Sequence, residues 1–348
     1  TDYFAVQRGP GRDLVAEFVE AARGEGLGVG LYYSLMDWHH PDGWRCKDDE
    51  AARRRFVDFT RGCVRELMSG YGPIDILFYD VPMPLRSAEA WESEATTRMA
   101  RELQPGLIVN DRAMREEDYG TPEGRVEVAD RDWEVCMTTN DGEWGYADRP
   151  DGDWVSTRKI LYTLRECAGG GGNLLLNVGP MPSGEVDARS VERLRTVGQW
   201  TAVNGEAMYG PMERTKGKLE VWASHGFWTL RGNTAYLWNL RSYPEGGTMI
   251  IGGLETAPVR VSILGCEAPL SVEQRGVQTF VRGIPSENPE PHAGTPVFKF
   301  EFTEPPRQRI GFYPWAEPRI CLGGDAADVA TAAKADEADA NAADAGGA

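Results

Sequence analysis

The sequence of 348 residues lacks the spacings by which most metal and redox sites are recognised. It contains four His and six Cys residues, and none of them stand in an H-E-x-x-H or C-x-x-C arrangement. Because such spacings bring ligands together on one helix face or one tight turn, their absence removes the main argument for a zinc site or a disulfide framework. We therefore predict no metal and no cofactor, and we expect the scattered cysteines to be mostly free, buried thiols.

Basic residues are scarce relative to acidic ones, and long apolar runs are missing. The chain has 54 acidic and 37 basic residues, which gives a formal net charge of -17. Phosphate backbones and anionic membrane surfaces repel such a protein, so we expect no nucleic-acid partner and favour a neutral or small ligand. No run of 18 or more apolar residues occurs, so the sequence predicts no membrane span.

The chain also lacks an initiator Met and opens in the loop-like stretch Thr1-Asp2-Tyr3-Phe4. This favours a sequence taken from inside a longer gene. Any signal peptide would lie upstream of Thr1, so the sequence leaves the compartment open, as it does the oligomeric state.

The most informative stretch that is present runs from Ile74 to Asp80. It is mostly apolar, ends in a carboxylate and precedes two prolines, which is typical of a buried parallel strand that stops there. In α/β barrels and open α/β sheets, ligands bind at this carboxyl end. Asp80 is therefore the leading candidate for a catalytic residue, although an Asp after a strand also commonly forms a turn or caps a helix.

Strand and helix patterns alternate over the first 210 residues, which predicts a parallel sheet with helical crossovers. Helices are expected at 11–24, 50–69, 88–103, 156–168 and 187–204, and strands at 27–34, 74–80, 106–111, 125–129, 133–138 and 173–178. An eight-stranded barrel needs two more strands, and the first helix has no strand before it. We therefore predict an α/β fold, a TIM-like barrel that lacks about its first two strands.

The pattern changes after Tyr209-Gly210-Pro211. Short alternating runs, divided by Gly, Pro and Asn, occur at 218–223, 226–231, 235–240, 259–264 and 297–302. Such runs are typical of an antiparallel β-sandwich. We divide the chain into a barrel at 1–210, a sandwich at 211–320 and an Ala/Asp-rich tail at 321–348, which we expect to be disordered because it has few bulky apolar groups.

An ordered series of stretches resembles the family 29 glycoside hydrolases, the α-L-fucosidases. The series comprises Gly30 to Ser34 with Asp37-Trp38-His39-His40-Pro41-Asp42, Ile74 to Asp80, Gln104 to Arg112, Tyr119 to Glu123, Trp133 to Thr138 with Trp144-Gly145-Tyr146, Gly171 to Pro180, and Gly198 to Gly210. The resemblance implies a TIM-like barrel followed by a β-sandwich. It also implies retaining hydrolysis of terminal α-L-fucosides, with fucosylated glycans or glycoconjugates as substrates.

In retaining hydrolysis one carboxylate attacks the anomeric carbon, and a second carboxyl about 5 to 5.5 Å away protonates the leaving oxygen and then activates water. The resemblance implies that Asp80 is the nucleophile, in Phe-Tyr-Asp where relatives often have Trp-Phe-Asp-Gly. Arg112 matches a sugar-contacting Arg and is a candidate to keep Asp80 charged. Glu123 matches the acid/base of one branch and is our first choice, with Glu134 as the alternative.

Tyr32 and Phe78 match pocket-wall positions that pack on the sugar, although core packing is the default for an aromatic residue on a barrel strand. With Arg112 and Glu134 they make up the predicted substrate-binding set. The family's His-His pair lies on strands that are not in this sequence, so we expect His39-His40 to line the rim or cap a loop. The glycines at 169–172 lack a following Gly-Lys-Ser/Thr and are interpreted as a tight loop into a strand.

We therefore predict an α-L-fucosidase or a truncated piece of one. The missing strands favour a catalytically impaired carbohydrate-binding relative of the same fold, whereas the retained Asp80 and Glu123 argue against it. A hydrolase of the same fold that acts on another sugar is the third possibility.

Overall fold

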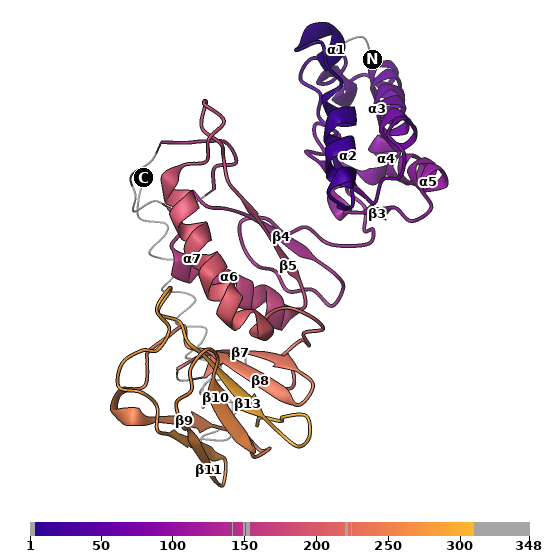
Figure 1. The fold of residues 1–348 in the computed structure, drawn as a ribbon. Helices are drawn as coiled ribbons and strands as arrows, with labels where there is room; N and C mark the ends of the chain where they lie inside the picture. Colours follow the sequence, from indigo (N-terminus) through magenta and orange to yellow (C-terminus); the bar gives the residue numbers. More distant parts are fainter. Residues whose placement is uncertain are drawn as a thin grey trace, which may run out of the picture. The chain divides into compact units, whose positions relative to one another are not determined.

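The computed structural model describes residues 4–140, 142–148, 150, 154–219, 222, 223 and 225–309 (Figure 1). The chain divides into two compact units, Thr1–Asp153 with Gly171–Glu185, and Trp154–Gly170 with Val186–Ala348. This division does not coincide with a boundary near residue 210, because the two helices at 157–170 and 188–204 group with the second unit. The domain boundaries of the barrel, 1–210, and of the sandwich, 211–320, stay a prediction. The tail at 321–348 lies outside the described residues.

In the first unit the strands pair in parallel, as the alternating pattern predicts. The first group is β1 (Gly30–Ser34), β2 (Ile76–Asp80) and β3 (Ile108–Val109), in that order. The second group is β4 (Glu134–Thr138) and β5 (Asn173–Asn177). Each strand therefore presents its carboxyl end at the same edge as its neighbour.

An extended segment at 119–123 lies between the two groups. Parallel bridges join Asn110 to Tyr119 on one side and Glu123 to Cys136 on the other, so the pairing runs without a break from β1 to β5. The strand expected at 125–129 is wrong: that stretch is irregular and mostly exposed. The segment that pairs lies six residues earlier and brings Glu123 into the sheet.

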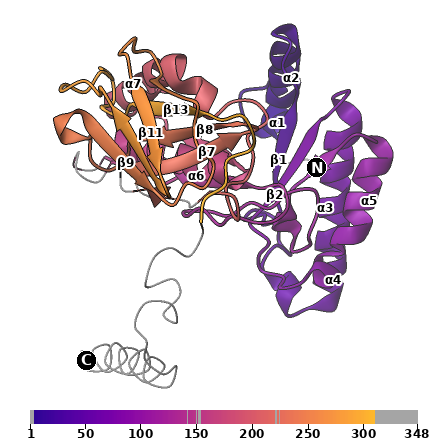
Figure 2. The same cartoon turned by 90° about the horizontal axis from the view of Figure 1, so that it is seen from below.

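Helices cover one face of the β1 to β3 sheet (Figure 2). They are α2 (Leu14–Gly24), α3 (Glu50–Gly70) and α5 (Ser93–Leu103), accompanied by the short α1 (Ala5–Arg8), α4 (Ala88–Trp91), η1 (Arg45–Lys47) and η2 (Asp111–Ala113). The Asp13 carboxylate caps α2 and the Asp49 carboxylate caps α3, because each accepts backbone N–H bonds that the first helical turn leaves unpaired. Val19, Phe56, Leu77 and Met99 share one core cluster.

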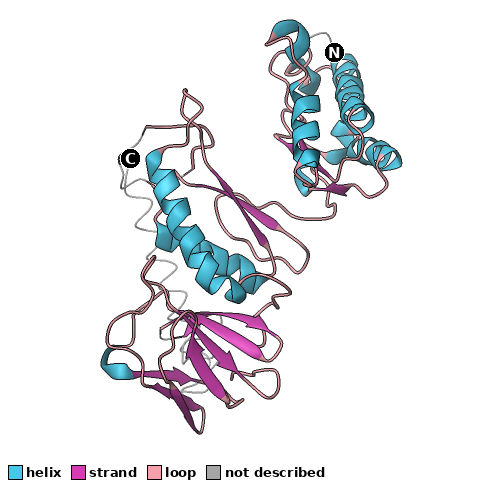
Figure 3. Ribbon diagram, in the orientation of Figure 1, coloured by secondary structure: helices cyan, strands magenta, loops and turns pink. Residues whose placement is uncertain are grey.

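The described part of the second unit combines antiparallel sheets with helices (Figure 3). The larger sheet has the order β10 (Arg260–Ile263), β13 (Val297–Glu301), β8 (Thr234–Trp238), β7 (Gly226–Arg231), β6 (Trp222–Ala223). The smaller one has the order β11 (Ser271–Arg275), β12 (Gln278–Arg282), β9 (Thr248–Gly252). The remaining elements are α6 (Thr157–Gly170), α7 (Ala188–Asn204), η4 (Gly205–Ala207) and η5 (Glu245–Gly247).

The larger sheet is covered on both faces. Met249 and Ile251 of the smaller sheet share a buried cluster with Leu237 and Phe300, which is the arrangement of a β-sandwich. On the other face, residues of α6 and α7 pack against the same sheet; the ring centroids of Trp200 and Trp238 are 4.7 Å apart. The larger sheet is therefore an inner layer, which explains its nearly continuous apolar strands.

Other expectations concern cysteines, metals and membranes. Cys46 and Cys136 are buried thiols and Cys63 and Cys266 are half-buried ones, as expected, whereas Cys321 lies outside the described residues. Among the described helices none is long and apolar enough to cross a membrane. In the same part of the chain no group of three His, Cys, Asp or Glu side chains has the arrangement of a metal site.

The glycine run before β5 has a packing role that a stability measurement can test. A methyl group at Gly172 would lie only 2.2 to 2.5 Å from the ring of the buried Trp133. We expect Gly172→Ala to lower the free energy of unfolding by about 1 to 3 kcal/mol through overpacking, measured by urea denaturation. Gly106→Ala is the matched control, because its added methyl would meet no atom within 4 Å. Equal effects of the two substitutions would contradict this role.

Candidate active site

Asp80 is the last residue of β2, and its carboxylate accepts hydrogen bonds from a residue on β1 and from a residue that follows β3. The Tyr32 hydroxyl, on β1, donates to Oδ2 over 2.7 Å, and Arg112 Nη1, just after β3, donates to Oδ1 over 2.7 Å. Burial by itself would raise the pKa of Asp80. The hydrogen bonds from Arg112, Tyr32 and the Val81 backbone N–H outweigh it and hold that pKa below its usual value. The carboxylate is thus kept charged.

The backbone directly after Asp80 is strained. Val81 has a φ of 47°, in the left-handed region that β-branched residues avoid. Strain of this kind costs on the order of 1 to 3 kcal/mol and is retained mainly at functional sites. Here it accompanies the hydrogen bond between the Val81 backbone and the Asp80 carboxylate. Glycine would adopt the same conformation freely.

Arg112 lies in η2, where the chain turns away from β3. Asn110, fully buried, fixes this turn: its side chain accepts a hydrogen bond from Tyr79 N and donates one to Tyr79 O, both 2.9 Å long. Arg112 Nε in turn donates to Thr121 Oγ1 over 3.0 Å. The guanidinium is therefore held by both neighbours in the sheet, β2 and the segment 119–123.

Glu123 shares this guanidinium with Asp80. Arg112 Nη2 lies 2.7 Å from Glu123 Oε2, while Nη1 lies 2.7 Å from Asp80 Oδ1. The other oxygen of Glu123, Oε1, accepts a hydrogen bond of 2.9 Å from the indole N–H of Trp144. Both carboxylates pair with one planar guanidinium and therefore lie close together, as the two carboxyl groups of a retaining glycosidase do.

Glu134 has a different environment. It begins β4 and is half-buried, and burial raises the pKa of its carboxyl. Its backbone N–H donates to Gly120 O over 2.9 Å, which ties it to the same extended segment as Glu123. Among the described residues its carboxylate is not one of the groups paired with Arg112. The structure therefore brings Glu123, and not Glu134, into the polar cluster with Asp80.

Tyr32 and Phe78 form a flat wall beside these carboxylates. Their rings are stacked with centroids 6.0 Å apart, and the guanidinium of Arg112 lies 5.5 Å from the Phe78 centroid. Tyr32 is 57% exposed, so its ring is not core packing. A flat apolar face next to charged hydrogen-bonding groups suits one face of a sugar ring.

His39 and His40 lie in the loop after β1 and are placed by a turn. Asp37 Oδ1 accepts the backbone N–H bonds of both, at 2.8 and 2.9 Å. The ring of His40 packs on Phe59, with centroids 4.6 Å apart. Both residues line a groove of about 680 Å³ at this loop. This arrangement agrees with the interpretation of the pair as a capped loop.

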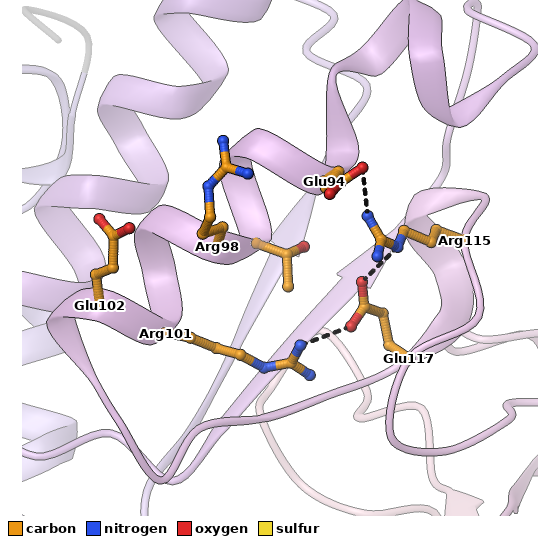
Figure 4. Close-up of a pocket in the computed structure, with 7 residues that line it drawn as sticks. Glu94, Arg98, Arg101, Glu102, Arg115 and Glu117 are labelled. Atoms are coloured by element: carbon orange, nitrogen blue, oxygen red, sulfur yellow. Dashed lines mark ion pairs between the residues drawn. The ribbon is translucent and has the colours of Figure 1, made fainter.

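A separate charged cleft of about 340 Å³ shares no residue with the Asp80 cluster (Figure 4). It lies between α5 and the loop after η2. Glu117, almost fully buried, is paired there with Arg101 at 2.9 Å and with Arg115 at 3.3 Å. Because Glu94, Arg101, Arg115 and Glu117 are paired across this cleft, we assign it to holding the loop after Arg112 against α5.

Sequence reasoning missed Asn110, Thr121 and Trp144. Asn110 lies two residues before Arg112 and Thr121 two residues before Glu123, but neither carries a charge that would single it out. Trp144 lies 21 residues from Glu123 in an irregular stretch, so no periodicity connects the two. The Trp-Gly-Tyr motif was the available signal for it.

A pair of neighbouring carboxyl groups is the arrangement that glycoside hydrolases use, and the carboxyl edge of a parallel sheet is where the active sites of α/β barrels lie. A family model described as alpha-L-fucosidase matches residues 1–206. The chain therefore belongs to the α-L-fucosidase family, as the sequence motifs predict.

Individual relatives agree with this family. The tissue α-L-fucosidases of Bos taurus and Homo sapiens are each 29% identical, over 297 and 280 residues, and cover 80% and 75% of this chain. The match covers 62% and 58% of those relatives, so the chain spans about three fifths of their length. The solved α-L-fucosidase isoenzyme 1 of Paenibacillus thiaminolyticus is 29% identical with a TM-score of 0.74, covering 87% of this chain and 79% of that one.

The strain at Val81 leads to a stability prediction. We expect Val81→Gly to leave the free energy of unfolding equal or higher, because about 1 to 2 kcal/mol of left-handed strain is relieved. The exposed Val128 is the control, and Val128→Gly should lose about 0.5 to 1 kcal/mol to the flexibility of glycine in the unfolded chain. Thermal and urea unfolding measure both. A loss above 1 kcal/mol for Val81→Gly alone would contradict the assignment of strain.

Proposed function

We propose that the protein is a retaining α-L-fucosidase that removes terminal α-L-fucose from fucosylated glycans or glycoconjugates. The observation that supports this most directly is the single guanidinium of Arg112, bonded to both Asp80 and Glu123. Family membership supports the choice of fucose as the sugar. Tyr32 and Phe78 would pack on the ring, and Arg112 would contact sugar and carboxylates.

In the proposed reaction the charged Asp80 attacks the anomeric carbon while Glu123 gives its proton to the glycosidic oxygen. This forms a fucosyl ester on Asp80 and releases the rest of the glycan. Glu123, now ionised, takes a proton from water, and the resulting hydroxide equivalent cleaves the ester with overall retention. Both oxygens of Glu123 accept N–H bonds here, and a protonated carboxyl keeps lone pairs that can accept such bonds.

We also propose that the parallel sheet is part of a TIM-like barrel. Five strands and the segment 119–123 pair in one continuous series, and Asp80 and Arg112 follow the carboxyl ends of two of them. An eight-stranded barrel requires two strands more than the described residues supply. The proposed limits remain 1–210 for the barrel and 211–320 for the sandwich.

Glu134 is the second candidate for the acid/base. Burial raises the pKa of its carboxyl, which is the direction that a general acid needs. The argument against Glu134 is that its carboxyl is not among those paired with Arg112, whereas those of Asp80 and Glu123 are. The two assignments lead to different chemical rescue results.

Azide rescue separates the roles of the three carboxyls, using an aryl α-L-fucoside with a good leaving group. We expect Asp80→Gly with azide to give the inverted β-fucosyl azide, because azide replaces the missing nucleophile. Glu123→Ala with azide should give the retained α-fucosyl azide through the fucosyl ester, while Glu134→Ala should give none. Product NMR measures the configuration. Retained azide from Glu134→Ala instead would assign the acid/base to Glu134, and turnover of other aryl glycosides alone would remove fucose as the substrate.

The acid limb of the pH profile tests how Asp80 is kept charged. Catalysis needs ionised Asp80, and its lowered pKa means that kcat/KM is lost only when the pH falls through that depressed value. Tyr32→Phe removes one donor, so the acid limb should move to higher pH by roughly one unit. Tyr33→Phe, on the opposite face of β1, is the matched control and should leave the limb in place. An unmoved limb in Tyr32→Phe would contradict the role of this hydroxyl.

A further inference from the structure

The two oxygens of Glu123 have donors from two different parts of the first unit. Arg112 Nη2 pairs with Oε2, and the indole N–H of Trp144 donates to Oε1 over 2.9 Å. Arg112 also pairs with Asp80, so the position of its guanidinium depends on both carboxylates. Trp144, by contrast, donates its indole N–H to Glu123 and not to Asp80.

Trp144 itself is held by the carboxyl ends of β4 and β5. The side-chain amide of Asn177, the last residue of β5, donates to Trp144 O over 2.8 Å. The buried Asn140, just after β4, donates to Gly145 O over 3.1 Å. Two carboxamides at the ends of neighbouring strands therefore fix the backbone that carries the indole.

A close backbone approach adds a third constraint. A methyl group at Gly179 would lie 2.5 Å from Gly145 C and 2.6 Å from Tyr146 N, so only glycine lets the chain after β5 pass this close. Backbone atoms cannot rotate away as a side chain would. The position of the Trp144 loop is thus coupled to the chain that leaves β5.

These contacts serve a carboxyl that would otherwise be loosely held. The Glu123 side chain is 42% exposed and projects from a short extended segment that pairs with its neighbours only through single bridges. Trp144 is 41% exposed, so it contributes little to a core and its polar contact is its most specific one. An acid/base must be placed within hydrogen-bond reach of the glycosidic oxygen, and small displacements reduce the rate strongly.

We propose that Trp144 is a positioning residue for the acid/base Glu123, held in place by Asn177 and by the close approach of Gly179. This inference rests on the proposed function, because it assigns a role within that reaction. Through these contacts the end of β5 helps to determine where the proton of Glu123 is delivered.

Dependence on the leaving group distinguishes positioning from a structural role. Trp144→Phe keeps a flat ring and removes the N–H. With an alkyl α-L-fucoside, whose leaving oxygen needs a proton, kcat/KM should fall about 10- to 100-fold, the effect of losing one hydrogen bond to a charged group. With α-L-fucosyl fluoride or a dinitrophenyl fucoside, which need little acid assistance, it should change less than about twofold.

Matched variants control for general damage. Trp44→Phe removes another exposed indole N–H, from a ring packed against Lys47, and should leave both substrates unaffected. Gly179→Ala should reproduce the leaving-group pattern of Trp144→Phe because it displaces the loop. Gly62→Ala, whose methyl would meet no atom within 4 Å, should leave kinetics unchanged.

All variants are made in the protein expressed from its full gene. Equal losses on good and poor leaving groups, or no loss on either, would overturn the positioning role while leaving the proposed fucosidase intact. A wild-type protein without fucosidase activity would overturn the proposed function and this role together. The contact has its own readout: the indole 1H–15N signal that disappears in Trp144→Phe should shift in Glu123→Gln, and an unshifted signal would contradict the hydrogen bond.

Discussion

The guanidinium of Arg112 is the interaction on which the site depends. It is only 15% exposed and faces two carboxylates, so it offsets the cost of bringing Asp80 and Glu123 together out of bulk water. Arginine suits this task because its planar fork offers parallel donors and keeps its charge. One cation still leaves an excess negative charge. Asp80 also accepts hydrogen bonds from Tyr32 and the Val81 backbone, and these favour its ionised form.

The sheet supplies the rigidity that this arrangement needs. Asn110 ties the end of β3 to Tyr79, the residue before Asp80, through two hydrogen bonds that resemble a continued ladder. Thr121 links Arg112 to Asp111, which is paired with Arg131 in turn. The unfavourable backbone conformation at Val81 comes directly after the residues that these hydrogen bonds fix. A strained backbone at Val81 and hydrogen-bonded polar side chains thus occur together at the carboxyl ends of β2 and β3.

The sequence predicts the part of the site that follows from strand ends. Asp80, Arg112 and Tyr32 lie at or beside the carboxyl ends of strands with clear apolar patterns, so parallel pairing alone brings them together. Glu123 belongs to a segment with no such pattern: its pairing partner could be found only in three dimensions, and 125–129 was the wrong choice. The helix expected at 88–103 is interrupted at Glu92, whose φ of 51° is stabilised by pairs with Arg53 and Arg61. Strands such as β11, with the sequence Ser-Val-Glu-Gln-Arg, carry too little apolar signal to be recognised.

The two carboxyls are thus supported in unequal ways. Asp80 depends on regular strands, whose register is set by a buried core and admits little variation. Glu123 depends on the short segment 119–123, which pairs only through single bridges, and on a loop held by two Asn side chains. Loops tolerate insertion and change more readily than strands do. The proposed nucleophile is fixed by strands and the proposed acid/base by a loop, which gives a physical reason why sequence motifs point to Asp80 alone but leave Glu123 and Glu134 as alternatives.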